Sequence, residues 1–331
     1  MPNTLVMTIL IVVIAVIFDV INGFHDSANA IACAVSTRSL TLREAVIISA
    51  VLNFTGAFLS VSVAETVGKG IVNPNNITQE VIIAALIGAI IWNLITWYFG
   101  IPSSSSHALI GGIVGSSIIY KGTFLIVNWS TLFWKVILWL ILSPIIGFIV
   151  GFILMNVIKA FLVNTRPSTV TRVFSKAEIF STMFLALSHG GNDAQKTMGV
   201  ITMTLVSAGF IKEFSVPIWV KITCALAMAC GTAMGGKRII KTMGSKMAKI
   251  VPVSGFAAEM GSSVVILIAT IFQSPVSTTH IINSAIMGVG SAKRLSAVRW
   301  SVVKDIVITW VFTIPSCAII SGIVLLLINL V

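Results

Sequence analysis

Charged residues are scarce in this sequence: Asp, Glu, Lys and Arg make up 9% of its 331 residues, whereas 57% are apolar. A soluble globular domain carries roughly 25% charged residues. The deficit excludes a soluble domain, because a chain of this composition has too few polar residues to cover its surface. Apolar runs at 5–16, 81–95 and 264–271 extend with their neighbours to the roughly 20 residues that cross a bilayer. The sequence therefore predicts an all-α polytopic membrane protein.

Cysteine is also rare, and its spacing shows neither a disulfide framework nor a metal site. The four cysteines stand singly in apolar segments, which predicts packing roles. They are Cys33, Cys224, Cys230 and Cys317.

Positive charge is present but confined to a few segments. The net charge is +11, and 15 of the 21 Lys and Arg residues fall in four linkers. These linkers hold Arg38 and Arg43, and run from Lys159 to Lys176, Lys237 to Lys249 and Lys293 to Lys304. The alternate linkers are nearly neutral, as the positive-inside rule produces. The charge thus indicates membrane topology rather than nucleic-acid binding. It predicts a multi-pass protein of the cell membrane with both termini outside.

The sequence contains an internal repeat. Asp26 and Asp193 stand 167 residues apart in similar motifs, and Pro102/Pro275 and His107/His280 share an offset of 173. The basic linkers give the two halves opposite orientations. We therefore expect a first inverted repeat at 1–160, a basic cytoplasmic linker at 161–177 and a second repeat at 178–331. Several apolar blocks are too long for one crossing, which predicts broken or re-entrant helices and a midplane site between the repeats.

Two of the ten acidic residues stand at matching positions within apolar spans. A buried carboxylate costs several kcal/mol unless it is paired or binds an ion. Amides flank both motifs, and nearby glycines favour local unwinding that exposes carbonyl oxygens. Oxygen ligands of these kinds suit a small hard cation such as sodium. The predicted cation ligands are Asp26, Asn29, Asn192, Asp193 and Gln195. The alternative is that each carboxylate only bonds a neighbouring group such as Lys196.

Hydroxyl clusters form the second matched pair. Each follows a proline and precedes an apolar stretch, which is typical of a helix N-terminus. Unsatisfied N–H groups and the helix dipole favour an anion there, so two such ends predict a site for a tetrahedral oxyanion. The predicted ligands are Ser104, Ser105, Ser106, Ser277, Thr278, Thr279 and Lys196. The alternative is ordinary capping of two re-entrant turns.

The remaining polar residues in these motifs have more than one interpretation. Lys196 pairs with an aspartate, attracts the anion, or does both. His107 and His280 are expected to be structural hydrogen-bond donors, although histidine also suits proton coupling. Glu65 and Glu259 are secondary candidates.

The motifs at 23–30, 189–199 and 275–280 resemble the paired signatures of the inorganic phosphate transporter (PiT) family. The resemblance spans both halves, with one departure: Phe24 and His25 precede Asp26, where the family motif usually has Gly-Ala-Asn-Asp. It implies about twelve transmembrane helices in two inverted repeats, a homodimer, and transport of phosphate with a coupling cation.

The resulting hypothesis is a secondary transporter that imports inorganic phosphate by symport with sodium, with Na⁺ as coupling ion and no other cofactor. The alternative within the same fold is a proton-coupled phosphate transporter or a sulfate transporter. An intramembrane hydrolase does not need two copies of every motif, and the serine runs lack a Gly-x-Ser-x-Gly elbow. A passive channel does not need buried carboxylates beside anion donors. We therefore expect no enzyme.

Overall fold

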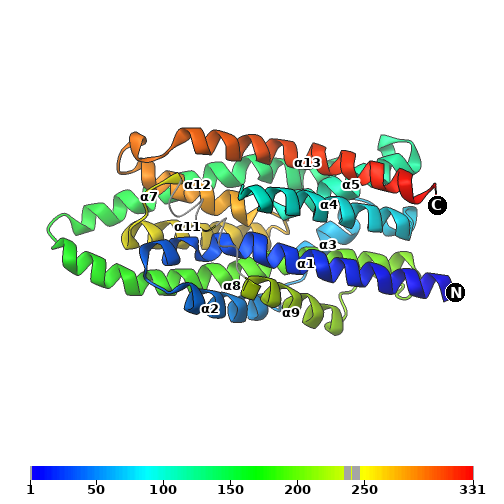
Figure 1. The fold of residues 1–331 in the computed structure, drawn as a ribbon, viewed down its shortest axis with the longest axis horizontal. Coiled ribbons are helices and arrows are strands. Elements are labelled where there is room, and N and C mark those ends of the chain that lie inside the picture. Colours follow the sequence, from blue (N-terminus) through cyan, green and yellow to red (C-terminus); the bar gives the residue numbers. More distant parts are fainter. Residues whose placement is uncertain (1, 235–239, 241–246, 331) are drawn as a thin grey trace.

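The computed structural model is an elongated bundle of helices that describes residues 2–234, 240 and 247–330 (Figure 1). The predicted basic linker from Lys237 lies mostly outside the described residues. The first half contains α1 (Pro2–Thr37), α2 (Leu42–Gly56), α3 (Ser62–Glu65), α4 (Gln79–Phe99), α5 (Ser105–Lys121), α6 (Trp129–Thr131) and α7 (Leu138–Leu162). The second half contains α8 (Pro167–Ser207), α9 (Ile218–Met234), α11 (Pro252–Ile271), α12 (Thr278–Ser291) and α13 (Trp300–Ile328).

Five helical segments are long and apolar enough to cross a membrane, which agrees with the predicted polytopic class. They are Thr4–Thr37, Gln79–Phe99, Trp129–Leu162, Pro252–Ile271 and Trp300–Ile328. The described part of the chain contains ten helices of 14 residues or more. The expected number of about twelve spanning helices is therefore not confirmed.

Two helical hairpins interrupt the bundle at the predicted hydroxyl clusters. Helix α4 ends at Gly100, whose φ of 66° is readily adopted only by glycine. After a short non-helical segment, the Ser104 side chain caps α5 by accepting from the His107 N–H at 3.3 Å. Ser277 caps α12 in the same way, on the His280 N–H at 3.2 Å. The predicted helix starts are confirmed. Both lie inside the molecule, and α5 and α12 run from there toward opposite ends (Figure 1).

The predicted unwinding around Asp26 and Asp193 is wrong, because α1 and α8 run through these residues without a break. The neighbouring glycines instead permit close helix contacts. A Cβ on Gly23 would lie 2.6 Å from the Met228 carbonyl oxygen of α9, and a Cβ on Gly190 would overlap the backbone of α2. Small residues allow membrane helices to approach this closely.

Gly23→Ala is expected to destabilise the protein, because the added methyl group must push α1 away from α9. Overpacking of this kind costs about 1–3 kcal/mol. The measurement is the thermal unfolding midpoint of the detergent-solubilised protein. Gly70→Ala is the control, since the nearest atom to its Cβ is a Thr131 methyl group at 3.3 Å. Equal midpoints for both variants would contradict the packing explanation.

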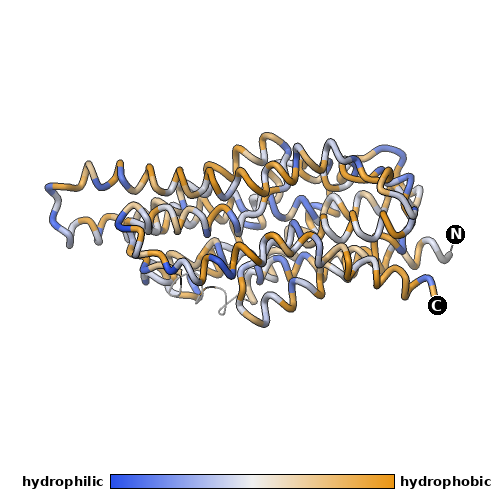
Figure 2. The backbone as a smooth tube through the Cα atoms, turned by 90° about the horizontal axis from the view of Figure 1, so that it is seen from above, coloured by the Kyte–Doolittle hydropathy of each residue, from blue (hydrophilic) through white to orange (hydrophobic). Residues whose placement is uncertain are grey.

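The main helix contacts join the two halves of the chain. Helix α1 packs against α9 and α2 against α8, while α5 packs against α13 and α7 against α12. Helices α1 and α8 run in opposite directions, and both termini lie at the end of the bundle away from the α7–α8 turn (Figure 1). Hydrophobic residues line most of the helices, and hydrophilic ones gather at the tip of that turn (Figure 2).

A buried polar layer separates two apolar clusters. Along α1 the first cluster includes Phe18 and the second begins at Ala28. Along α8 the second includes Leu185 and the first resumes at Ala194. The residues between them are polar and buried, so the two aspartates lie in a layer enclosed by hydrocarbon.

Candidate functional site

The two hairpin breaks meet within this polar layer. The Ser106 hydroxyl donates to the Val276 carbonyl oxygen at 3.2 Å, so the two non-helical segments touch. All six predicted hydroxyl residues are buried, at most 3% exposed. Two helix N-termini with their hydroxyl groups therefore converge in one place, as predicted for an anion site.

Asp26 joins α1 to both hairpins. The Ser105 hydroxyl of α5 donates to Asp26 Oδ2 and lies 2.7 Å from Asn22 Oδ1. The Thr279 hydroxyl of α12 lies 3.1 Å from Asp26 Oδ1. Asn29, one turn further along α1, donates to the Thr279 hydroxyl oxygen at 2.6 Å. The first predicted carboxylate is thus 1% exposed and surrounded by hydroxyls and amides.

Asp193 is the equivalent residue on α8. The Thr278 hydroxyl of α12 donates to Asp193 Oδ2 at 3.2 Å. The Lys196 ammonium group donates to Asp193 Oδ1, to the Ser106 hydroxyl of α5 and to the Val276 carbonyl oxygen, the last at 3.0 Å. Lys196 therefore contacts both the carboxylate and the two hairpin breaks, which combines its two predicted roles.

The two halves of the site match except at one position. The offset of 167 residues carries Asn29 onto Lys196, and the offset of 173 carries Ser106 onto Thr279. Asn29 donates to Thr279, and Lys196 donates to Ser106. The contacts are therefore equivalent, but a neutral amide in the first half is an ammonium group in the second.

The other predicted amides make different contacts. Asn192 donates to the Thr270 hydroxyl of α11 at 2.8 Å. The Gln195 side-chain oxygen accepts from the Val63 N–H at 2.8 Å and thereby caps α3, so it does not join the cluster. The side-chain oxygens of Asn29 and Asn192 are buried without a partner among the described residues. These two oxygens are free to bind a cation.

Each carboxylate also has an imidazole neighbour, which the sequence motifs did not assign. His25 Nδ1 lies 2.8 Å from Asp26 Oδ1, and His189 Nε2 lies 3.3 Å from Asp193 Oδ2. Both histidines are buried, with 0% and 1% exposure. A proton on either ring would be next to a carboxylate.

The histidines at the helix starts do not act as expected. The rings of His107 and His280 lie 4.9 Å apart, and His280 stacks on Trp310 at 3.9 Å. Neither ring nitrogen of His280 has a hydrogen-bond partner within the described ranges. The prediction of a structural donor is therefore wrong for His280.

A network behind the carboxylates was missed entirely. The side-chain oxygen of Asn53 on α2 lies 3.2 Å from His189 Nδ1, and its amide donates to Ser27 and Thr232, each at 3.0 Å. A lone amide inside the apolar block 44–66 was the available signal, since polar side chains at that depth bond neighbouring helices.

Of the secondary candidates, only one is buried. Glu65 pairs with Lys69 at the surface, at 3.3 Å. Glu259 is fully buried, and the Ser181 hydroxyl donates to it at 2.5 Å. Glu178, also fully buried, lies nearby on α8 and was not predicted. These two glutamates form a separate polar cluster from the hairpin site.

A polytopic helical bundle with one buried polar site between two helical hairpins belongs to the class of secondary membrane transporters. A family model described as "Phosphate transporter family" matches residues 22–169 and 163–321. The chain belongs to this family, and the resemblance seen in the motifs is confirmed.

Similar proteins cover the whole chain. A Bacillus subtilis protein named "Probable low-affinity inorganic phosphate transporter" is 47% identical and covers 100% of both chains. A Rhizobium meliloti protein of the same name is also 47% identical, over 97% of each chain. A solved structure named "The sodium-dependent phosphate transporter" shares 25% identity and a TM-score of 0.88, covering 98% of this chain and 100% of that one.

Proposed function

We propose that the chain imports inorganic phosphate by symport with sodium. The observation that carries this proposal is the meeting of two hydroxyl-rich helix N-termini with two buried carboxylates. The N–H groups and hydroxyls suit the phosphate oxygens. The Lys196 ammonium group adds a charge-assisted donor. The names of the relatives and of the similar solved structure support phosphate and sodium as the transported species.

The charge balance of the site supports cotransport. With neutral histidines, Asp26 and Asp193 carry two negative charges against the single positive charge of Lys196. A phosphate anion alone would add to this excess in a layer with little water. Cations bound to the carboxylates and to the free amide oxygens would neutralise it, so phosphate and cations bind best together.

The membrane potential then supplies the driving force. Each sodium ion that moves inward gains about 2.3 kcal/mol per 100 mV. If the number of cations exceeds the charge of the anion, the potential drives phosphate accumulation. In our proposal the cation ligands are the two carboxylates with Asn29 and Asn192, and Gln195 supports the fold.

We further propose that residues 1–160 and 178–331 are inverted repeats, joined by a cytoplasmic linker at 161–177, with alternating access around the site between them. Three observations support this: the opposite directions of α1 and α8, the matched contacts of the two hairpins, and the shared position of both termini. The proposal includes a homodimer in the cell membrane with both termini outside.

Proton coupling is the second candidate, because His25 and His189 touch the two carboxylates. A proton on an imidazole would neutralise the site as a cation does. Histidine has an unperturbed pKa near neutrality and is suited to this role.

Uptake into proteoliposomes separates these proposals. Labelled phosphate uptake is measured with an inward sodium gradient, with an inward proton gradient and with neither, and with sulfate as competitor. We expect sodium alone to drive accumulation, and sulfate not to compete. Accumulation driven only by protons would establish the second candidate. Uptake that responds to neither gradient would overturn symport.

A further inference from the structure

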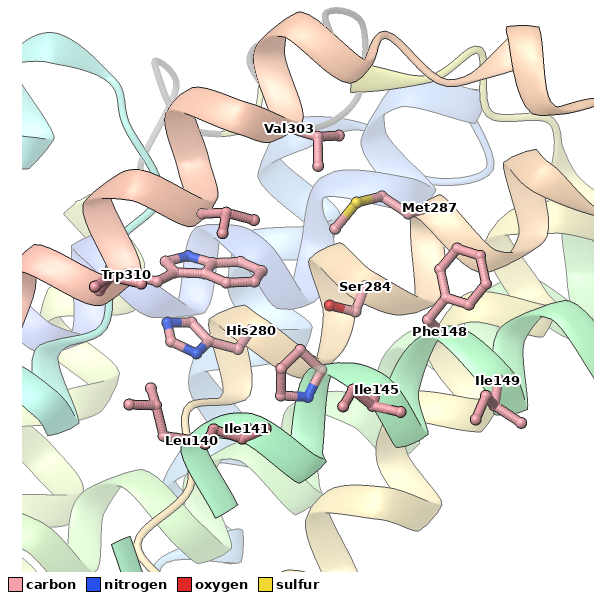
Figure 3. Close-up of a pocket in the computed structure, with 13 residues that line it drawn as sticks. Leu140, Ile141, Ile145, Phe148, Ile149, His280, Ser284, Met287, Val303 and Trp310 are labelled. Atoms are coloured by element: carbon pink, nitrogen blue, oxygen red, sulfur yellow. The ribbon is translucent and has the colours of Figure 1, made fainter. Parts of the chain in front are cut away.

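A cavity of about 460 Å³ lies behind the hairpin site, between α7, α12 and α13 (Figure 3). Its volume falls within the roughly 300–1,000 Å³ of ligand pockets. The walls are aliphatic and aromatic side chains such as Ile145, Phe148 and Val307, with His280 and Ser284 as the polar exceptions. An apolar cavity of this size does not hold ordered water.

The cavity borders the outer, lipid-facing surface of the bundle. Ile141, Ile145 and Val311 line it and are also 56%, 48% and 62% exposed. They lie on α7 and α13, which belong to the spans with the fewest buried residues. Because hydrocarbon surrounds these helices, an occupant enters from the bilayer. An empty cavity would forfeit the dispersion contacts of its walls.

His280 provides the polar feature of the cavity. It is fully buried, lies at the cavity wall, and has no partner for either ring nitrogen among the described residues. A buried polar group without a hydrogen bond costs about 1–3 kcal/mol. A hydroxyl group both donates and accepts, so it satisfies His280 in either tautomer.

Trp310 connects this cavity to the hairpin site. Its ring forms part of the wall and stacks on His280, 3.9 Å between centroids and 25° between planes. Its indole N–H donates to the Pro102 carbonyl oxygen at 3.2 Å. Pro102 precedes the hydroxyl cluster of α5, and His280 follows that of α12. Trp310 therefore contacts both hairpin breaks.

We propose that this cavity binds a neutral single-chain lipid of the long-chain alcohol class, whose hydroxyl bonds His280 and whose chain lies between α7 and α13. The charged headgroup of a phospholipid stays at the membrane surface, because a charge is costly at the depth of the hairpin breaks. Through Trp310, the bound alcohol restrains both hairpins and slows transport; this second effect rests on the proposed phosphate transport.

Binding is tested by quenching of Trp310 fluorescence with stearyl alcohol brominated at mid-chain, added to vesicles that contain the protein. The Trp310 signal is the difference between the unmodified protein and Trp310→Phe. We expect saturable quenching at a low mole fraction of the alcohol. Val307→Phe, which fills the cavity, is expected to raise the half-saturating mole fraction at least about tenfold. Ile153→Phe, a half-exposed position on α7 outside the cavity, should not change it.

Two results would overturn the binding proposal. One is quenching that rises linearly and equally with phosphatidylcholine brominated at mid-chain, which would show bulk lipid chains in the cavity. The other is no quenching by the alcohol, as expected if a second copy of the chain covers this face.

Phosphate uptake provides the second measurement. Unbrominated stearyl alcohol is expected to lower the maximal uptake rate of the unmodified protein, and this loss should disappear in Val307→Phe. Saturable binding without any change in uptake would overturn the coupling through Trp310. Saturable binding in a chain that transports no phosphate would leave the lipid site standing and would refute the proposed function instead.

Discussion

Asp193→Asn is expected to reduce sodium-driven phosphate uptake about 100-fold or more, since it removes a cation ligand and leaves the buried Lys196 without its counter-charge. Breaking a buried ion pair from one side costs about 3–5 kcal/mol. The measurement is the initial rate of labelled phosphate uptake into proteoliposomes under a fixed inward sodium gradient. Asp305→Asn is the control, because Asp305 lies at an exposed position of α13.

A second variant separates a loss of folding from a loss of the site. In Asp193→Asn/Lys196→Gln both charges are removed, so we expect the thermal midpoint to recover toward that of the unmodified protein while uptake stays low. If uptake recovered together with stability, Asp193 would not be a cation ligand.

Lys196→Met is expected to raise the phosphate concentration for half-maximal uptake by roughly 100-fold, because the anion loses a charge-assisted donor worth about 1.5–3 kcal/mol. Asn29→Leu removes the matching neutral donor from the first half, for which about tenfold is expected. The ratio of the two effects tests the difference between an ammonium group and an amide at equivalent positions.

The same pair of variants has a clear contrary result. Equal increases in half-maximal concentration would mean that the Lys196 charge serves only to neutralise Asp193. Lys221→Met on α9, far along the chain from either hairpin, is the matched lysine control and should leave the concentration unchanged.

The hairpin site was largely predictable from the sequence. Proline followed by hydroxyl residues has a local physical meaning at a helix start, and Ser104 and Ser277 cap α5 and α12 accordingly. A carboxylate within an apolar run is costly wherever it lies, so Asp26 and Asp193 were found from their surroundings alone. The repeated order of these motifs indicated that they meet.

Tertiary packing determined what the sequence did not reveal. Glycine favours unwinding in isolation, but Gly23 and Gly190 contact the backbones of other helices, and α1 and α8 stay helical. Asn53 and Glu178 bond residues more than a hundred positions away, so no local pattern marks their partners. Gln195 was assigned by its motif, whereas its contact with Val63 depends on the position of α3.

The exchange of helix partners between the halves has a consequence for biosynthesis. Helix α1 closes against α9 and α5 against α13, so the first half enters the membrane well before its partners are made. During that interval Asp26 has no Thr279 beside it, and the glycine surface of α1 faces lipid or another protein. The polar layer is complete only after α13 is inserted. Assembly is therefore a late, concerted event in the bilayer rather than a succession of finished hairpins.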